Sequence, residues 1–396
     1  MESRLFQQRI QKLQKMLSER EIEAALIMYS RDLYYYAGTA QPANLWIPAD
    51  GKPVLFTRRA HELAQEASWI KDSIPAGSFK DMLKALTELG SLPKRGSVVG
   101  IQEDVLPTNI GFSIRNNLSQ FEFVNISKEI KKQRLVKDDI ELEAIKQSIE
   151  LWEKGHLAIL HALREGIHEY ELSASMEFAA RNNGGDGLVW FRRWDAVLPG
   201  GGIVTSGPNG WIVSGHAMTV TGVGLDETLP WGASSRKIQK GELIVVDYGI
   251  CKKGYHADMA RTYCIGKPTV NQQDLWNHLV ELHLLVIEKV KPGVTGEELF
   301  LYAEKIAEKK GYLNNFMGVG NSRGSYIGHA IGLELDEDPV LGLGFQEPLP
   351  QGAVITLEPK FMVPGLGAVM VEDDIVLTKS GHQLLGSLKH ELFYRD

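Results

Sequence analysis

Apolar side chains in the first third of the chain recur with the spacings of helices and of buried strands. Phe6, Ile10, Leu13 and Leu17 repeat every three or four residues, which predicts an amphipathic helix. Short apolar runs predict strands at 24–28, 53–56 and 97–101. Between them, helical spacing predicts helices at 59–67 and 81–89. Strands that alternate with helices are typical of an α/β domain. We place this domain at residues 1–126.

The next stretch, 127–139, is polar and charged, which is typical of a solvated linker. Beyond it the apolar spacing predicts helices and short buried strands that do not alternate strictly. The helices are expected near 142–166, 168–182, 275–292 and 295–311, and the strands at 243–246, 354–357, 369–371 and 375–377. This order favours an α+β domain over residues 140–396.

Composition and charge exclude several classes of protein. The chain has 43 Lys and Arg against 50 Asp and Glu, a formal charge of −7, which argues against a nucleic-acid partner. Neither a secretory signal nor an apolar run long enough to span a membrane is apparent, so we expect a cytoplasmic protein with no membrane partner. Two cysteines exclude a disulfide framework and a cysteine-rich zinc module.

Five potential metal ligands occur in the second half of the chain. Asp247 ends the apolar run LIVVD, and Asp258 follows eleven residues later, after a glycine-containing stretch that suits a hairpin turn. Two antiparallel strands joined there would bring these two carboxylates side by side. His329 lies in the glycine-rich stretch GHAIG, Glu358 follows VITL, and Glu372 follows VMV.

Carboxylates at the ends of buried strands are costly unless a positive charge compensates them. Two divalent cations would compensate four carboxylates, and such a pair can activate a bridging water and polarise a carbonyl. Oxygen ligands with one imidazole suit manganese, iron, cobalt or zinc, and these ligands do not choose among them.

The same residues carry a resemblance to a known family. The segment Asp247-Tyr-Gly-(x)₄-Gly254-Tyr255-x-x-Asp258-x-x-Arg261-Thr262 resembles the first metal motif of the pita-bread (M24) metallopeptidases, which include prolidase, aminopeptidase P and the metal-free creatinase. The resemblance continues through Gly328-His329, Thr356-Leu357-Glu358-Pro359 and Val371-Glu372-Asp373. Residues 32–38 (DLYYYAG) resemble the creatinase-type N-terminal domain, as in the prolidase branch.

The resemblance implies a creatinase-like N-terminal domain, a pita-bread catalytic domain and a dinuclear hydrolase similar to Xaa-Pro dipeptidase. Asp247 would bind one metal, Asp258 and Glu372 would bridge both, and His329 and Glu358 would hold the other. The metal-bridged water would attack an amide carbonyl, with Glu358 relaying its proton. The family also suggests a homodimer and a small peptide or other small molecule as substrate.

The chain departs from the family pattern at two accessory histidines. One belongs to a His-Glu pair, and here that position is Asp336, before Glu337. The other precedes the first metal strand, where one alignment places Trp231 and a rival alignment places His216. An ionised Asp336 cannot donate a hydrogen bond to an oxyanion, but it could bind a substrate ammonium or act as a base. Two alternatives therefore stay open: a metal-dependent amide hydrolase or lyase acting on a non-peptide molecule, and a metal-bound protein without peptidase activity.

Overall fold

Two units, each with its own hydrophobic core, make up the computed structural model, which describes residues 2–215 and 220–396. The N-terminal unit runs through Arg134 and includes the short piece Arg192–Trp194. The C-terminal unit comprises Leu135–Phe191 and Asp195–Asp396. Among the described residues, the helices are all too short or too polar to cross a bilayer.

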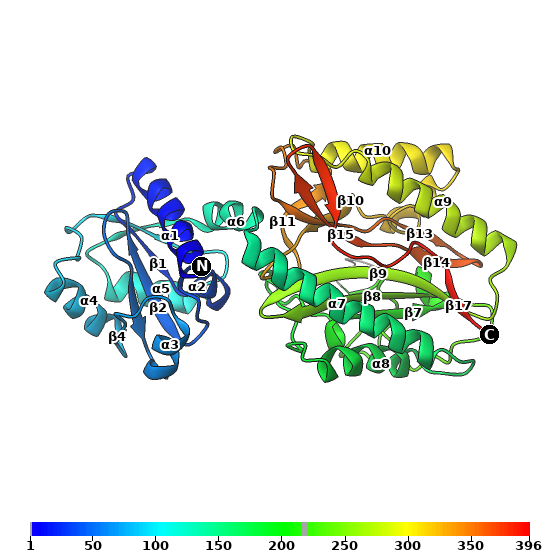
Figure 1. Ribbon diagram of the computed structural model, residues 1–396, viewed down its shortest axis with the longest axis horizontal. Coiled ribbons are helices and arrows are strands. Elements are labelled where there is room, and N and C mark those ends of the chain that lie inside the picture. The colour runs from blue at the N-terminus through cyan, green and yellow to red at the C-terminus, as the bar shows by residue number, and fades with distance from the viewer. Residues whose placement is uncertain (1, 216–219) are drawn as a thin grey trace. The chain divides into compact units, whose positions relative to one another are not determined.

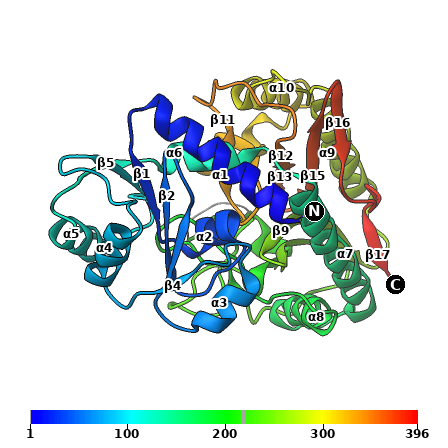
Figure 2. The ribbon, with the colours of Figure 1, turned by 60° about the vertical axis from the view of Figure 1, so that its left-hand side comes forward.

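A mixed six-stranded sheet forms the N-terminal unit, with strand order β4-β3-β2-β1-β5-β6. One face packs against α4 and α5 through Met82, Leu86 and Ile114, and Figure 2 shows these helices beside each other at one side of the sheet. The elements are α1 (Glu2–Glu19), β1 (Ala24–Ile27), α2 (Ser30–Ala37), β2 (Ala43–Pro48), β3 (Val54–Thr57), α3 (His61–Ala67), β4 (Ile74–Pro75), α4 (Phe79–Glu88), β5 (Val98–Ile101), α5 (Thr108–Asn117), β6 (Glu122–Asn125) and α6 (Ser127–Leu135).

The stretch 127–139 differs from the solvated linker expected from its charge. Most of it is helix α6, and Asp138 caps the following helix through a capping box with Glu141. Arg134 is buried and pairs with Asp32 of its own unit at 2.6 Å, and buried Lys137 pairs with Glu337 of the C-terminal unit at 3.0 Å. The expectation of a solvated stretch was wrong because the partners of these cations lie 102 and 200 residues away in sequence.

The C-terminal unit has layers of sheet covered by helices, and the α+β arrangement expected for it is confirmed. In Figure 1, α7 and α8 cover one side of the β7–β9 sheet, while α9 and α10 lie on the opposite side of the unit. The elements are α7 (Asp139–Ala162), α8 (Glu169–Asn182), β7 (Gly202–Ser206), β8 (Leu243–Lys252), β9 (Tyr255–Ile265), α9 (Val270–Ile287), α10 (Gly296–Lys309), β10 (Tyr326–Ala330), β11 (Glu337–Gly342), β12 (Val354–Leu357), β13 (Lys360–Val363), β14 (Gly367–Met370), β15 (Asp373–Thr378), β16 (Gly381–Leu384) and β17 (Phe393–Arg395), with short 3₁₀ turns at Pro199–Gly201, Gly207–Trp211, Leu313–Asn315 and Gly320–Ser322.

The β8–β9 hairpin is the centre of this unit. It lies in a four-stranded sheet of order β17-β9-β8-β7, next to a five-stranded sheet of order β11-β10-β12-β15-β16 and the two-stranded pair β13-β14. Helix α7 holds the hairpin in place, because the indole N–H of Trp152 donates to the Tyr248 carbonyl at 3.0 Å. Helix α8 approaches α7 closely at Gly155, where a Cβ atom would lie 2.0 Å from the Met176 sulfur.

A buried histidine in α7 makes the stability of this unit sensitive to pH. Burial and, to a smaller extent, the charge of Arg261 lower the pKa of His156 to about 4. Its Nδ1 lies 2.7 Å from the Tyr263 hydroxyl. The unfolded chain therefore binds one more proton than the folded chain between about pH 6.5 and 4, so stability falls as the pH falls through this window.

We predict that His156→Gln flattens the dependence of unfolding free energy on pH between pH 7 and 5, by on the order of 1–2 kcal/mol. Urea unfolding at a series of pH values measures the slope. The exposed His161, five residues along the chain, provides the control His161→Gln, which should keep the wild-type slope. An unchanged slope in His156→Gln would contradict the prediction.

Candidate metal centre

The hairpin of β8 and β9 carries the two aspartates of the predicted centre. In the strand register, Asp247 lies opposite Ala260 and Asp258 lies opposite Gly249. The predicted hairpin is thus confirmed, and the two carboxylates are diagonal neighbours on one face rather than directly opposed. Both are buried, with 8% and 6% of their surfaces exposed.

The remaining three candidates arrive from the five-stranded sheet. His329 lies in β10, opposite Thr356 of β12, while Glu358 follows the end of β12 and Glu372 precedes β15. The backbone N–H of Glu372 donates to the Ala260 carbonyl at 3.1 Å, which joins this sheet to the hairpin. The structure therefore brings together residues that are separated by up to 125 positions (372 − 247) in the chain.

The ligand atoms of Asp258, His329 and Glu372 all lie within 4.8 Å of one another. His329 Nε2 lies 3.7 Å from Asp258 Oδ2 and 3.9 Å from Glu358 Oε1. Asp247 is close enough for its charge to act on both Asp258 and Glu372. All five candidates are thus near one another, from separate elements of one unit.

The electrostatics of this cluster favour a cation beside its carboxylates. Burial raises the pKa of Asp258 well above its usual range, and Asp247 and Asp374 raise it further. Burial also raises the pKa of Glu372, again with the help of Asp258 and Asp247. Glu372 Oε1 accepts a hydrogen bond from the Thr356 hydroxyl at 2.8 Å, but its buried Oε2 has no hydrogen-bond partner among the residues that the structure describes. Oxygen-rich donors with one imidazole and an unpaired buried oxygen fit a divalent cation.

Lys360 is a member of this cluster that sequence reasoning missed. Its side chain is 3% exposed, and its Nζ donates to Glu358 Oε2 at 2.5 Å. The signal in the sequence is weak: Lys360 lies two residues after a ligand candidate, between the apolar segments 354–357 and 361–363, and a single lysine does not reveal its own burial. A lysine in a buried strand needs an anion beside it.

Asp336 also joins the cluster. Its Oδ1 lies 3.2 Å from His329 Nε2, nearer than Asp258 or Glu358, and its side chain is 30% exposed. The loop that carries it is tied to the stretch before β7, because the Leu335 backbone N–H donates to the Trp190 carbonyl at 2.8 Å. Of the three carboxylates of Asp258, Asp336 and Glu358, which all lie within 4.0 Å of His329 Nε2, that of Asp336 is the most exposed to solvent.

Of the two candidates for the other accessory position, Trp231 and His216, the structure describes only Trp231. Trp231 donates its indole N–H to the Val197 carbonyl at 3.1 Å, and its ring packs against Gly215. His216 lies outside the described residues. Which of them takes the accessory position stays a prediction from the sequence alone.

Charged residues outside the acid cluster hold the backbone of Glu372 in place. The guanidinium of Arg261, which is fully buried, donates to the Glu372 carbonyl and to Asp373 Oδ1, both at 2.7 Å. Asp373 Oδ2 lies 2.8 Å from His283 Nε2 and 2.6 Å from His390 Nε2. Burial alone would raise the pKa of Asp373, but Arg261 and the two histidines outweigh it and hold that pKa well below its usual range. Asp373 is thus a carboxylate, and both imidazoles donate to it.

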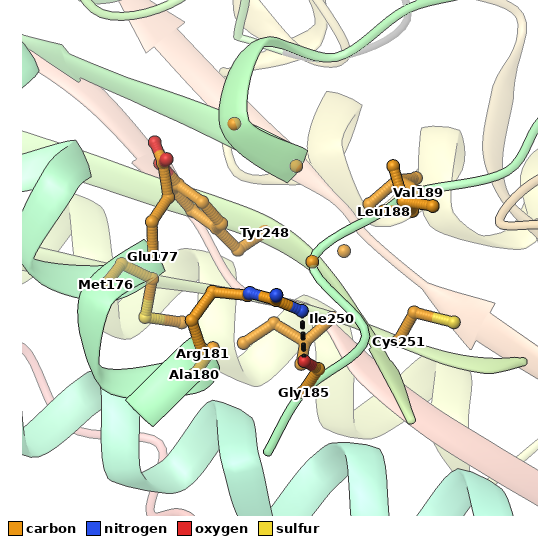
Figure 3. A pocket seen from close by; sticks show the side chains of 14 residues that line it. Met176, Glu177, Ala180, Arg181, Gly185, Leu188, Val189, Tyr248, Ile250 and Cys251 are labelled. Atoms are coloured by element: carbon orange, nitrogen blue, oxygen red, sulfur yellow. Dashed lines mark hydrogen bonds between the residues drawn. The ribbon is translucent and has the colours of Figure 1, made fainter. Parts of the chain in front are cut away.

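A small pocket of about 100 Å³ lies between α8 and β8, lined in part by Glu177, Arg181 and Tyr248 (Figure 3). Tyr248 and Asp247 are neighbours in a strand, so their side chains point to opposite faces, and the pocket lies on the face away from the acid cluster. Its volume is below the roughly 300–1,000 Å³ of typical ligand sites. We therefore assign the candidate site to the acid cluster.

Comparisons with known proteins find matches that cover both units. Residues 143–379 match metallopeptidase family M24, and residues 9–136 match the creatinase/prolidase N-terminal domain. A Xaa-Pro dipeptidase of Pyrococcus furiosus is 28% identical over 386 residues, covering 97% of this chain and 99% of that protein.

Solved structures extend the similarity to the whole fold. The Xaa-Pro dipeptidase of Bacillus anthracis superposes with a TM-score of 0.83 at 25% identity, covering 98% of this chain and all of that one. The X-Pro aminopeptidase of Thermotoga maritima gives a TM-score of 0.79 at 26% identity, covering 98% and 99%.

We predict that Arg261→Met destabilises the C-terminal unit by about 3 kcal/mol or more, because it leaves Asp373 buried without its main counter-charge. Urea unfolding followed by tryptophan fluorescence measures the change. Arg115→Met is the control, since this arginine pairs with Glu103 at an exposed position and should contribute about 1 kcal/mol or less. Equal effects of the two substitutions would contradict the role given to Arg261.

Proposed function

Because the chain belongs to metallopeptidase family M24, we propose that it is a dinuclear metal-dependent dipeptidase that cleaves Xaa-Pro peptides. Family membership makes it a peptidase-like metallohydrolase, and the full-length similarity to Xaa-Pro dipeptidases supports the substrate. The observation that carries the proposal is the convergence of Asp258, His329 and Glu372 within 4.8 Å, beside Asp247 and Glu358.

Each ligand has a proposed role. Asp247 would hold one ion, Asp258 and Glu372 would contact both ions, and His329 and Glu358 would hold the second. The ligand atoms of Asp258 and Glu372 lie within 4.8 Å of each other and of His329, which supports shared positions for these two carboxylates. Bound manganese, cobalt, iron or zinc would lower the pKa of water and polarise the substrate carbonyl.

The protein groups around the ions would handle protons and orient the substrate. Glu358 Oε1 faces His329 at 3.9 Å while Oε2 is held by Lys360, so Oε1 is the atom we assign to accept the proton of the attacking water. Asp336, partly exposed, would bind the N-terminal ammonium of a dipeptide. His216 is retained as a candidate hydrogen-bond donor on the sequence argument alone, and the homodimer and cytoplasmic location also stay predictions.

One observation favours a second candidate function. Asp336 occupies a position where the family resemblance leads us to expect an imidazole donor, and a carboxylate cannot donate to an oxyanion. A metal-dependent hydrolase or lyase acting on a small non-peptide molecule with a cationic group is therefore the alternative. Metal binding without Xaa-Pro cleavage would favour it.

We predict that the purified protein contains divalent metal and that Asp258→Asn loses both the metal and the hydrolysis of Xaa-Pro dipeptides. Mutation of a residue that hydrogen-bonds to a metal ligand lowers metal affinity or activity about 10–100-fold, so loss of a bridging ligand should lower them at least as much. Elemental analysis and a dipeptide assay with added Mn²⁺ or Co²⁺ measure the two effects. The exposed Asp226→Asn is the control and should change neither. Undiminished metal content in Asp258→Asn would refute the bridging role.

We predict that Asp336→Asn raises KM for Xaa-Pro dipeptides about tenfold and changes kcat less, because a contact to the substrate ammonium is made equally in the ground state and the transition state. Steady-state kinetics with a dipeptide and with its N-acetylated form measure this. The N-acetylated form carries no ammonium, so it should not distinguish the variant from the wild type. A fall in kcat with an unchanged KM would assign Asp336 to the chemical step instead.

A further inference from the structure

Glu169, the first residue of α8, is a fully buried carboxylate that the proposed mechanism does not use. Its Oε1 accepts hydrogen bonds from the backbone N–H and the hydroxyl of Ser206, both at 2.7 Å. Its Oε2 accepts from the Asn209 amide at 2.7 Å and from the N–H and hydroxyl of Ser234 at 3.0 and 2.5 Å. Burial raises the pKa of Glu169, and these hydrogen bonds oppose the rise. Bonds from three residues to both oxygens hold the carboxylate in one position.

The three donor residues come from both ends of the segment between β7 and β8. Ser206 ends β7 and Asn209 follows it, whereas Ser234 lies shortly before β8 and is 65 residues from Glu169 in sequence. We call residues 206–215 the first arm and residues 220–234 the second arm. Glu169 therefore joins the two arms to each other and to α8.

The arms are also bonded to each other close to Asn209. The Val223 N–H donates to Asn209 Oδ1 at 2.9 Å, and the Gly222 N–H donates to the Ile212 carbonyl at 3.1 Å. A Cβ atom at Gly222 would lie 2.8 Å from Asn209 Nδ2, so the second arm approaches this side chain closely. The side chain that Glu169 holds is thus itself a contact between the arms.

Both arms pack on the face of the β8–β9 hairpin that carries the candidate ligands. Val220 of the second arm is fully buried in an apolar cluster with Val245 and Ala260, and Trp211 of the first arm packs against this cluster. Ala260 lies opposite Asp247 in the strand register, and Val245 lies two residues before Asp247. Side chains at these positions share one face of a sheet. The arms therefore border the acid cluster.

We propose that Glu169 is a positioning residue for substrate binding, which holds the two arms on the acid face of the hairpin, where they form one wall of the substrate site. This inference rests on the proposed function, because it assumes that the peptide binds at the acid cluster. Glu169 itself contacts neither metal nor substrate, since the arms occupy both of its oxygens. Its effect on activity passes through the arms.

The substitution Glu169→Gln tests this anchor with little change in size. An amide nitrogen cannot accept a hydrogen bond, so in either orientation it faces the backbone N–H of Ser206 or of Ser234 and loses that bond. We expect KM for Xaa-Pro dipeptides to rise about tenfold with a smaller change in kcat, because a displaced wall weakens binding in the ground state and the transition state alike. Metal content should stay at the wild-type level.

Hydrogen exchange followed by mass spectrometry gives a readout that does not depend on activity. In Glu169→Gln the amides of the two arms should exchange about tenfold or more faster, while β8 and β9 keep their wild-type protection. Glu141→Gln is the matched control, because Glu141 is a buried glutamate in the first turn of α7 that accepts from the Tyr255 hydroxyl at 3.1 Å, outside the arms. It should change neither KM nor the exchange of the arms.

An unchanged KM in Glu169→Gln, or faster exchange spread evenly over the C-terminal unit, would overturn the inference and leave the proposed function standing. A wild type that cleaves no Xaa-Pro dipeptide would overturn both. If Glu169→Gln does not fold, Ser234→Ala decides, because it removes a single hydroxyl donor. A raised KM in Ser234→Ala would then support the inference, and an unchanged KM would overturn it.

Discussion

Mutual repulsion among buried carboxylates is the constraint on which the C-terminal unit depends. Asp247, Asp258, Glu358 and Glu372 come from two different sheets and are each less than 10% exposed. Burying four acids together is unfavourable unless cations compensate them. The fold supplies one of these cations itself, Lys360, while Glu372 Oε2 has no hydrogen-bond partner in the described part of the chain. Burial of this group makes its charges act strongly on one another.

The adjacent residues Glu372 and Asp373 have opposite electrostatic surroundings. Burial and the neighbouring acids raise the pKa of Glu372, whereas Arg261, His283 and His390 hold the pKa of Asp373 far down. The side chains of the two residues meet different partners, because Glu372 faces the other carboxylates and Asp373 faces a guanidinium and two imidazoles. Arg261 also binds the Glu372 carbonyl, so the same cation that neutralises Asp373 fixes the backbone of its neighbour.

The sequence predicted those elements that are determined by residues close together in the chain. The β8–β9 hairpin, helix α10 within the expected range 295–311, and the alternation in the N-terminal unit follow from spacing and turn residues. Partners that are distant in sequence were not accessible in this way. The fate of Arg134 and Lys137 depends on acids 102 and 200 residues away, and the charged stretch therefore looked solvated. Lys360 was missed because a single lysine says nothing of its burial until the strands around it are paired.

The network behind Glu372 joins residues from far along the chain. Arg261 lies in β9, and its guanidinium also donates to the Leu388 carbonyl, while His390 reaches Asp373 from the same late segment. During synthesis on the ribosome, Asp258 and Arg261 emerge well over a hundred residues before these partners (388 − 261 = 127). The hydrogen bonds around Arg261 and Asp373 can therefore be completed only after residue 390 has left the exit tunnel, although all five candidate ligands emerge before it.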